Sequence, residues 1–278
     1  MSYNERQPPH REIRQSVVRW TFQQFQLDEL CRRAAEIGLD GIDVLVPNEY
    51  EVPSRYGLQC SMAYVGLGDN KAVGINRTEH HDGFEAAFRK NAPLAQRAGI
   101  TSAIALCGPR STDLSDEMGA ANSIACLKRL APIAADYGVT ICLEPQNSKR
   151  DHPGYMCDRI TWAVNVCEEV GSPNVKLLFD LYHAQVMEGD LMETIRANAP
   201  WFHHYHTGGV PGRHEIDDTQ EINYRAVLKT ILATGFTGFV AHEFIPTTED
   251  PFDGLKNAYQ ICNRALSEEE RTRVAVSH

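Results

Sequence analysis

One pattern repeats along most of the chain: a short apolar or β-branched run, a loop, and an amphipathic segment that ends near a glycine. Apolar residues at helical spacing and a glycine stop predict helices at residues 27–38 and 223–235, among others. Eight apolar runs predict strands; they lie at residues 14–20, 41–46, 58–64, 101–108, 139–145, 175–183, 202–209 and 237–246. Eight strands that alternate with helices favour a closed (β/α)8 barrel with a parallel sheet.

The chain offers little support for other α/β arrangements. No G-x-G-x-x-G sequence follows the first predicted strand, which removes the main dinucleotide-binding alternative. No linker or low-complexity tract interrupts the chain, so we expect residues 1–278 to form a single TIM-barrel domain with loose termini at 1–12 and 267–278. Residues 48–57 are short for a helical unit and contain Pro53, so we expect a reduced second helix.

Charge and cysteine usage limit the partners and the compartment. Lys and Arg number 27 and Asp and Glu 37, a net charge of −10, so we expect neither nucleic acid nor an anionic membrane as partner. No apolar run approaches the length of a membrane span, and the polar N-terminus does not resemble a secretory signal. The eight cysteines form no C-x-x-C pair and suit buried thiols in a reducing cytoplasm, so we expect a cytoplasmic protein.

Four successive predicted strands, the fifth to the eighth, end in a residue that can bind a metal: Glu144, Asp180, His206 and Glu243. Catalytic residues of a (β/α)8 barrel lie at the C-terminal ends of its strands, so these side chains can converge on one half of the barrel mouth. Each alone has an ordinary explanation, since a glutamate can form a salt bridge and Asp180 can cap a helix. Four at matching positions predict a metal site.

The predicted ligands indicate which ion they would hold. Three carboxylates and one imidazole, with no thiolate, favour Mg²⁺ or Mn²⁺, whereas Co²⁺ and Zn²⁺ stay possible. His203, His204 and His206 lie together in the seventh predicted strand, WFHHYHTGG. Because strand side chains alternate between faces, His204 and His206 share a face and His203 points the other way. We expect His206 to bind the metal, with His204 one layer deeper.

Longer phrases carry a resemblance to a known family. The phrases are LEPQNSKRDHPGY, FDLYHAQVMEGD, GGVPGRHEID with EINY behind it, and HEFIP. The stretch from Leu143 to Pro246 resembles the hydroxypyruvate isomerase family, within the xylose-isomerase-like TIM-barrel sugar isomerases and epimerases. The resemblance implies that the four strand-end residues bind the metal. It also implies that Glu144 and Glu243 are catalytic acid–base groups on either side of the substrate.

The same resemblance implies two substrate-binding residues and contains one departure. His183, in the D-x-x-H sequence that starts at Asp180, matches a substrate-contacting histidine, and Arg213 matches a substrate-contacting arginine. From spacing alone, His183 can equally be a loop residue, and Arg213 can pair with a nearby acidic residue, Glu215 or Asp217. At the position of His206 hydroxypyruvate isomerases have glutamine, whereas ketose 3-epimerases have histidine.

We therefore expect a divalent-metal-dependent isomerase that interconverts a small 2-hydroxy aldehyde and its ketone isomer through an enediolate. Hydroxypyruvate and tartronate semialdehyde, or a related keto acid or sugar, are the first candidates, and a phosphorylated substrate is disfavoured. The alternative is a ketose 3-epimerase acting on free sugars. A DNA-repair endonuclease of the same superfamily is disfavoured, because it needs a multi-zinc cluster and a basic groove and this chain has a net charge of −10. A non-catalytic barrel is disfavoured, because it would not need both Glu144 and Glu243. A homodimer or homotetramer stays open.

Overall fold

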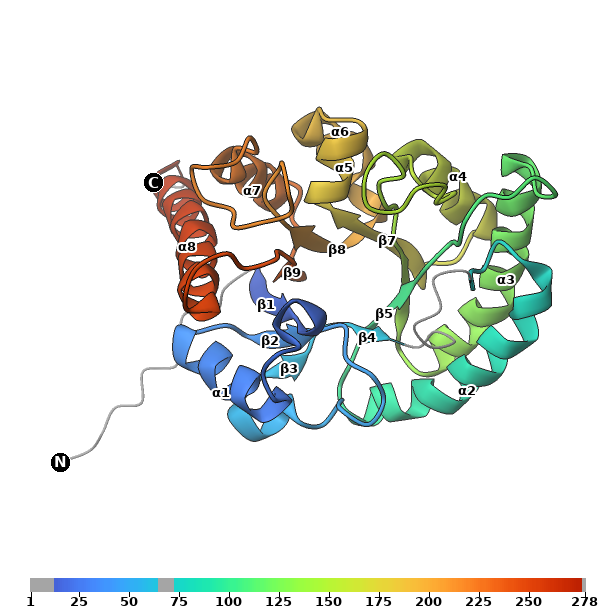
Figure 1. The fold of residues 1–278 in the computed structure, drawn as a ribbon, viewed down its shortest axis with the longest axis horizontal. Helices are drawn as coiled ribbons and strands as arrows, with labels where there is room; N and C mark the ends of the chain where they lie inside the picture. The colour runs from blue at the N-terminus through green and yellow to red at the C-terminus, as the bar shows by residue number, and fades with distance from the viewer. Residues whose placement is uncertain (1–12, 65–72, 277–278) are drawn as a thin grey trace.

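The computed structural model describes residues 13–64 and 73–276. In this part of the chain nine parallel strands form one sheet, in the order β3-β2-β1-β9-β8-β7-β6-β5-β4 (Figure 1). The strands are β1 (Arg14–Val18), β2 (Gly41–Asp43), β3 (Gln59–Cys60), β4 (Ala63–Tyr64), β5 (Ser102–Ala105), β6 (Thr140–Leu143), β7 (Val175–Asp180), β8 (Phe202–Thr207) and β9 (Phe239–His242). Because β3 and β4 end the order yet are close neighbours in the chain, the sheet closes into a barrel, which confirms the predicted TIM-barrel fold.

Each of the eight apolar runs contains a strand, but the third contains two. Gln59 and Cys60 pair with β2, whereas Ala63 and Tyr64 pair with β5. The segment therefore passes from one neighbour to the other between residues 60 and 63. Ser61 occupies this transition, and its backbone N–H donates to Ile42 O at 2.9 Å.

Helices surround the barrel (Figure 1). They are α1 (Leu27–Ile37), α2 (His81–Arg97), α3 (Asp116–Asp136), α4 (Ile160–Val170), α5 (Leu181–Met187), α6 (Leu191–Asn198), α7 (Tyr224–Ala233) and α8 (Pro251–Val276). Short 3-10 helices add η1 (Arg19–Phe22), η2 (Pro53–Tyr56), η3 (Thr78–His80) and η4 (Ala199–Trp201). The second unit has only η2, as its proline predicted. Residues 1–12 lie outside the described residues, whereas the expected loose end from 267 is helical as far as Val276.

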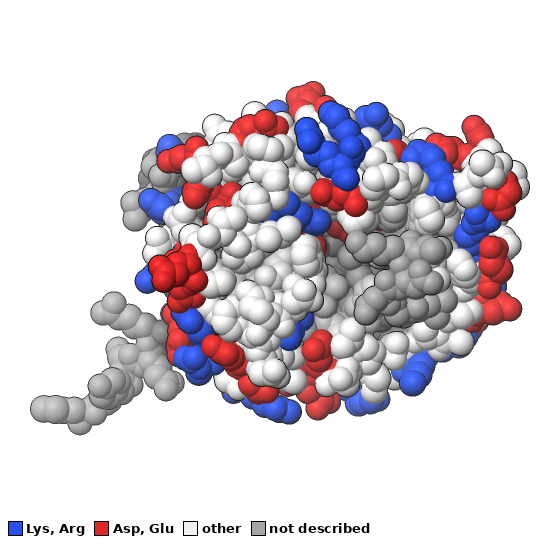
Figure 2. All heavy atoms as spheres, in the orientation of Figure 1, with Lys and Arg blue, Asp and Glu red and all other residues white. Residues whose placement is uncertain are grey.

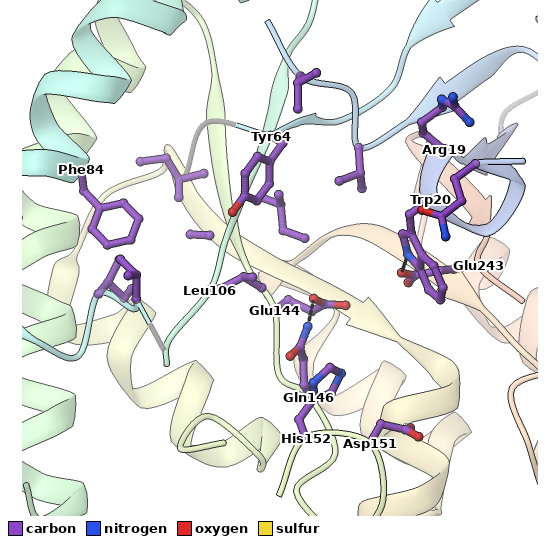
Figure 3. Close-up of a pocket in the computed structure, with 18 of the residues that line it drawn as sticks. Arg19, Trp20, Tyr64, Phe84, Leu106, Glu144, Gln146, Asp151, His152 and Glu243 are labelled. Atoms are coloured by element: carbon purple, nitrogen blue, oxygen red, sulfur yellow. Dashed lines mark hydrogen bonds between the residues drawn. The ribbon is translucent and has the colours of Figure 1, made fainter. Parts of the chain in front are cut away.

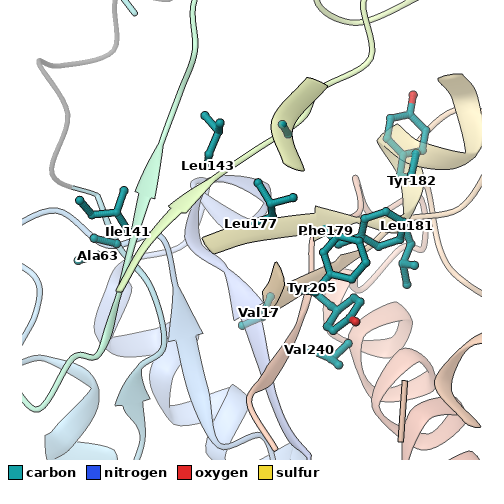
Figure 4. Close-up of a cluster of buried hydrophobic side chains, with 14 of the residues drawn as sticks. Val17, Ala63, Ile141, Leu143, Leu177, Phe179, Leu181, Tyr182, Tyr205 and Val240 are labelled. Carbon is teal, nitrogen blue, oxygen red and sulfur yellow. The ribbon is translucent and has the colours of Figure 1, made fainter. Parts of the chain in front are cut away.

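Apolar side chains fill two layers. The larger cluster contains strand residues such as Val17, Phe179 and Tyr205 (Figure 4) and helix residues such as Leu30 and Leu228, so it occupies the layer between barrel and helices. A separate small cluster is formed by residues of the β3–β4 segment and three following strands; they are Met62, Ile104, Cys142 and Leu178. Strand alternation places this small cluster on the opposite, inner face of the sheet.

Two expectations from composition also meet the structure. All eight cysteines are buried free thiols, as the apolar surroundings of several of them predicted. In the described ranges, no helix combines the length and the apolar character that a membrane span requires.

Candidate metal centre

The four predicted ligands lie together at the C-terminal end of the barrel. Glu144 follows β6, Asp180 ends β7, His206 is near the end of β8, and Glu243 follows β9. One ligand atom from each residue can be chosen so that all lie within 4.8 Å of one another, and all four residues are buried. Parallel register explains the convergence, since Asp180 is opposite His206, and His206 is opposite Ala241, two residues before Glu243.

Asp180 uses its two carboxylate oxygens for different purposes. Oδ1 caps helix α5 by accepting hydrogen bonds from the backbone N–H groups of Tyr182 (2.8 Å) and His183 (3.3 Å). Oδ2 faces the centre and accepts a hydrogen bond from Arg213 Nη2 at 2.9 Å. The helix-cap role is therefore present, and it leaves the second oxygen directed at the other ligands.

His206 stands between carboxylates on both sides. Its Nε2 lies 2.8 Å from Asp43 Oδ2, and its Nδ1 lies 2.5 Å from Glu243 Oε2. Burial disfavours the charged imidazolium, but Glu243 and Asp43 outweigh burial and raise the pKa of His206 well above its ordinary value. Since Asp43 holds Nε2, Nδ1 is the nitrogen available to a cation at the centre.

Asp43 was not predicted as part of the site. It ends β2, is fully buried, and accepts a hydrogen bond from Ser61 Oγ as well as the contact from His206. His204 Nε2 lies 3.2 Å from Asp43 Oδ1, and the rings of His204 and His206 are 5.3 Å apart. His204 is therefore on the inner face below His206, where strand alternation predicted it. A charged residue inside the apolar run GIDVLV was the only local signal for Asp43.

Glu243 is held at both oxygens. Trp20 Nε1 donates to Oε1 at 2.6 Å, while Oε2 is 2.8 Å from Arg213 Nη2 and also contacts His206. Burial raises the pKa of Glu243, but the positive charges of Arg213 and His206 outweigh it and hold this pKa below its ordinary value. The indole contact extends over 223 positions of sequence, which is why the sequence pattern did not reveal it.

Glu144 is the least compensated carboxylate. Gln146 Nε2 donates to its Oε2 at 2.6 Å, and its Oε1 lies 4.0 Å from His206 Nδ1. Burial and then the neighbouring charge of Glu243 raise the pKa of Glu144 to about 8. The site therefore gathers buried negative charge that is only partly balanced by the residues around it.

This donor set fits a divalent cation. Three carboxylates and one imidazole nitrogen are ligands that Mg²⁺, Mn²⁺ and related ions accept. Donor atoms within 4.8 Å of one another need only a small contraction to reach ligand distances of about 2.1 Å around one ion. The contact between His206 Nδ1 and a carboxylate oxygen also requires a positive charge between them, either a proton or a metal ion.

Arg213 and His183, the predicted substrate-binding residues, both border the cluster. Arg213 pairs with Asp180 and Glu243, and not with Glu215, whose carboxylate accepts hydrogen bonds from Thr247. His183 is 1% exposed, and its Nε2 lies 3.6 Å from Asp180 Oδ2 without a hydrogen-bond partner. An unpaired polar atom at this depth is unusual in a folded protein.

The loop after β8 brings Arg213 into place. Gly209 approaches the backbone so closely that an added Cβ would lie 2.2 Å from Glu215 O. Gly212 has φ of +91° and Arg213 itself has φ of +59°, a left-handed conformation that is uncommon for a residue with a side chain. The glycines therefore serve a tight turn, and the turn directs the guanidinium inward.

A cavity of about 750 Å³ adjoins the cluster. Glu144, Gln146 and His152 lie on one side of it, while Tyr64 and Phe84 lie on another (Figure 3). Trp20, Arg213 and Glu243 also line it. Most charged side chains on the face drawn in Figure 2 lie toward its periphery. The size and the mixed lining suit a small organic ligand.

Comparisons with known proteins agree with this architecture. Residues 31–262 match the family described as xylose isomerase-like TIM barrel. The chain is 31% identical to the 2-oxo-tetronate isomerase of Cupriavidus necator, covering 79% of this chain and 87% of that protein. It is 27% identical to the hydroxypyruvate isomerase of Escherichia coli, covering 80% of this chain and 90% of that protein.

A solved structure described as an AP endonuclease, family 2, from Brucella melitensis superposes with a TM-score of 0.80 at 28% identity. It covers 87% of this chain and 96% of the other. The two relatives in sequence are both named isomerases, and each similarity covers most of both chains. This chain is therefore an enzyme of the isomerase type. From the family match and these relatives, the chain belongs to the xylose isomerase-like TIM-barrel family.

Proposed function

We propose that this enzyme interconverts a small 2-hydroxy aldehyde and its ketone isomer with the help of one divalent metal ion. The observation that carries the proposal is the set of four buried side chains whose ligand atoms lie within 4.8 Å of one another at the end of the barrel. Hydroxypyruvate and four-carbon 2-oxo acids are the first substrates to consider, because they match the names of relatives that span most of the chain.

Glu144, Asp180, His206 and Glu243 would hold the ion, with Mg²⁺ or Mn²⁺ preferred and Co²⁺ or Zn²⁺ as alternatives. A divalent ion at this position supplies positive charge beside the substrate oxygens on which negative charge develops. Asp43 keeps Nε2 of His206 occupied, so that Nδ1 is left for the centre.

The two glutamates would move the proton. In the aldehyde-to-ketone direction, a carboxylate oxygen removes the proton from the carbon that bears the hydroxyl group, and a proton is returned to the former aldehyde carbon. The hydroxyl proton passes to the former aldehyde oxygen, which becomes the new hydroxyl group. Trp20 and Gln146 each hold one oxygen of a glutamate, so both carboxylates keep a fixed orientation. Both carboxylates are buried in the wall of the cavity, which limits their contact with bulk water.

His183 and Arg213 would bind the substrate. Arg213 carries a positive charge that faces the cluster and lines the cavity, which suits a substrate carboxylate or an oxygen that gains charge. His183 offers an unpaired ring nitrogen beside Asp180. The cavity of about 750 Å³ also has room for a substrate larger than a three-carbon acid.

A second candidate is a ketose 3-epimerase. Histidine at position 206 is the residue expected of ketose 3-epimerases, and its Nδ1 faces the other ligands. Both reactions begin with removal of a proton beside a carbonyl group, and they differ in the carbon and face to which the proton returns. An endonuclease is less favoured, because the candidate ligand groups in the described residues contain only His204 and His206 as histidines.

The test is to incubate Mn²⁺-loaded protein in D₂O with hydroxypyruvate, tartronate semialdehyde, four-carbon 2-oxo acids and free ketoses. NMR then follows both product identity and deuterium beside the carbonyl group. We expect deuterium-labelled isomer from an acid substrate, and loss of at least about 100-fold in kcat for Glu144→Gln and Glu243→Gln.

Glu188→Gln is the matched control, because Glu188 accepts a hydrogen bond from Ile160 N outside the cavity. We expect it to keep wild-type activity. If the protein epimerises a ketose but isomerises no acid substrate, the ketose 3-epimerase function replaces the isomerase function. Full activity in both glutamine variants, or activity that survives complete chelation, would refute the proposed chemistry.

A further inference from the structure

Asn147 lies in the loop after β6, is fully buried, and uses all its hydrogen-bonding capacity. Its Oδ1 accepts from the backbone N–H groups of Arg150 (3.1 Å) and Asp151 (2.9 Å). Its Nδ2 donates to Asp151 Oδ2 at 2.6 Å and lies 2.6 Å from His183 Nδ1. The reversed amide would set its oxygen against the Asp151 carboxylate and its NH₂ group against the two backbone N–H groups, so the orientation of Asn147 is determined.

The orientation of Asn147 determines the tautomer of His183. Because Nδ2 of Asn147 can only donate, Nδ1 of His183 must accept and carries no proton. The ring proton of neutral His183 is therefore on Nε2. That nitrogen has no hydrogen-bond partner, and its nearest acidic oxygen, Asp180 Oδ2, is too distant at 3.6 Å.

We propose that Asn147 is a positioning residue that makes His183 a hydrogen-bond donor toward the bound substrate. The recognised group is an oxygen with a free lone pair, such as a carbonyl or an ionised hydroxyl. The opposite tautomer would direct a lone pair toward the Asp180 carboxylate and could not donate to such an oxygen. The kinetic consequence rests on the proposed isomerase function, whereas the tautomer does not.

Asn147→Asp is made in an Asp151→Asn background, so that an amide N–H still joins positions 147 and 151, and the Asp151→Asn protein alone is its reference. An aspartate keeps an oxygen for the amides of Arg150 and Asp151, but it accepts from His183 Nδ1 where asparagine donates. Asn174→Asp is the matched control, because Asn174 Nδ2 donates to Val139 O, which immediately precedes β6, away from His183.

The experiment is NMR of metal-free protein labelled with ¹⁵N-histidine, with the His183 signals assigned by their loss in His183→Gln. We expect His183 to carry its proton on Nε2 in the wild type, in the Asp151→Asn reference and in the control Asn174→Asp. We expect the proton on Nδ1 in Asn147→Asp. A wild-type His183 protonated at Nδ1, or the same pattern in Asn147→Asp as in the wild type, would overturn the proposal. The wild-type spectrum decides the tautomer even if Asn147→Asp does not fold.

Kinetics provide the second readout. On a substrate that the wild type converts, Asn147→Asp should lower kcat/KM by about 10- to 100-fold relative to the Asp151→Asn reference, as loss of an outer hydrogen-bond partner usually does. Unchanged kcat/KM with a changed tautomer would refute the role in substrate recognition. If no substrate is converted while Nε2 carries the proton, the isomerase proposal fails and the tautomer assignment stands.

Discussion

Among single residues, Asp43 has the clearest influence on the candidate metal centre. It lies 2.8 Å from His206 Nε2, and outer partners of this kind orient a histidine ligand and increase its basicity. Asp43→Asn keeps the size of the side chain but removes the charge and can present an N–H group to Nε2. We expect Mn²⁺ to bind about 10- to 100-fold more weakly, measured by isothermal titration calorimetry.

Asp40→Asn is the control for this variant. Asp40 Oδ2 accepts a hydrogen bond from Gln15 N at 2.8 Å, and Asp40 contributes to neither candidate ligand group. We expect its Mn²⁺ affinity to equal that of the wild type. Equal affinity in Asp43→Asn and wild type would contradict the role given to Asp43.

His203 should make the free energy of unfolding depend on pH. Burial, with the nearby His204 and Lys176, lowers the pKa of His203 to about 4. Below the ordinary value of about 6.5 the unfolded chain binds a proton that the folded chain rejects, so stability falls as pH falls from about 6.5 to about 4. Urea unfolding between pH 7 and pH 4.5 should show that His203→Gln loses less stability than the wild type.

The expected difference between the two proteins is on the order of 1–3 kcal/mol at pH 4.5. At pH 7 both forms of position 203 are uncharged, so pH 7 serves as the reference for each protein. Identical losses of stability on acidification would show that His203 contributes no such pH dependence.

The sequence predicted the four strand-end residues because each interrupts an apolar run at the end of its own strand, which is a local signal. Asp43, Trp20 and Asn147 have roles that depend on contacts from distant parts of the chain. The contact of Asp43 with His206 spans 163 positions, and that of Trp20 with Glu243 spans 223. Periodicity within one element carries no information on such pairs, so only the folded barrel reveals them.

At the scale of elements, Asp180 joins the start of helix α5 to the candidate metal centre. Asn and Asp cap helices about equally well, whereas alanine costs about 0.5–2 kcal/mol. The free energy of unfolding of Asp180→Asn should therefore exceed that of Asp180→Ala by about 0.5–2 kcal/mol. Both variants lose the charge that faces Arg213, so the difference between them reports the cap on α5.

Chemical denaturation measures this difference, and Mn²⁺ titration of the same two proteins measures the site. We expect Asp180→Asn to retain the cap but, like Asp180→Ala, to bind Mn²⁺ far more weakly than the wild type. Equal stability of the two variants would remove the capping role, and wild-type affinity in either would remove Asp180 from the ligands.

Element boundaries show the limit of pattern reading. The run at residues 58–64 predicted one strand, but the residues that pair with β2 precede those that pair with β5. Which neighbour a strand residue meets depends on the stagger of the closed barrel, and stagger is a property of the whole sheet. The glycine stops were more reliable, since Gly38 ends α1 in the left-handed conformation and Gly235, two residues after α7, also has a positive φ.

At the scale of the molecule, barrel closure creates the site. The four predicted ligands come from separate strand ends between residues 144 and 243, and parallel pairing places them side by side. The eight-unit pattern was sufficient to predict this arrangement because the connections between parallel strands leave all carboxyl ends on one face. The cavity beside the cluster was not predictable, since its apolar lining combines residues from several elements.

The most direct measurement is a crystal structure of the protein grown or soaked with Mn²⁺, with anomalous scattering collected to locate the ion. We expect one strong anomalous peak within about 2.0–2.4 Å of ligand atoms from Glu144, Asp180, His206 and Glu243. We also expect His206 to bind through Nδ1 while Nε2 stays against Asp43. No peak at saturating Mn²⁺, or a peak held by Asp43 and His204 in place of the four ligands, would contradict the proposed metal centre.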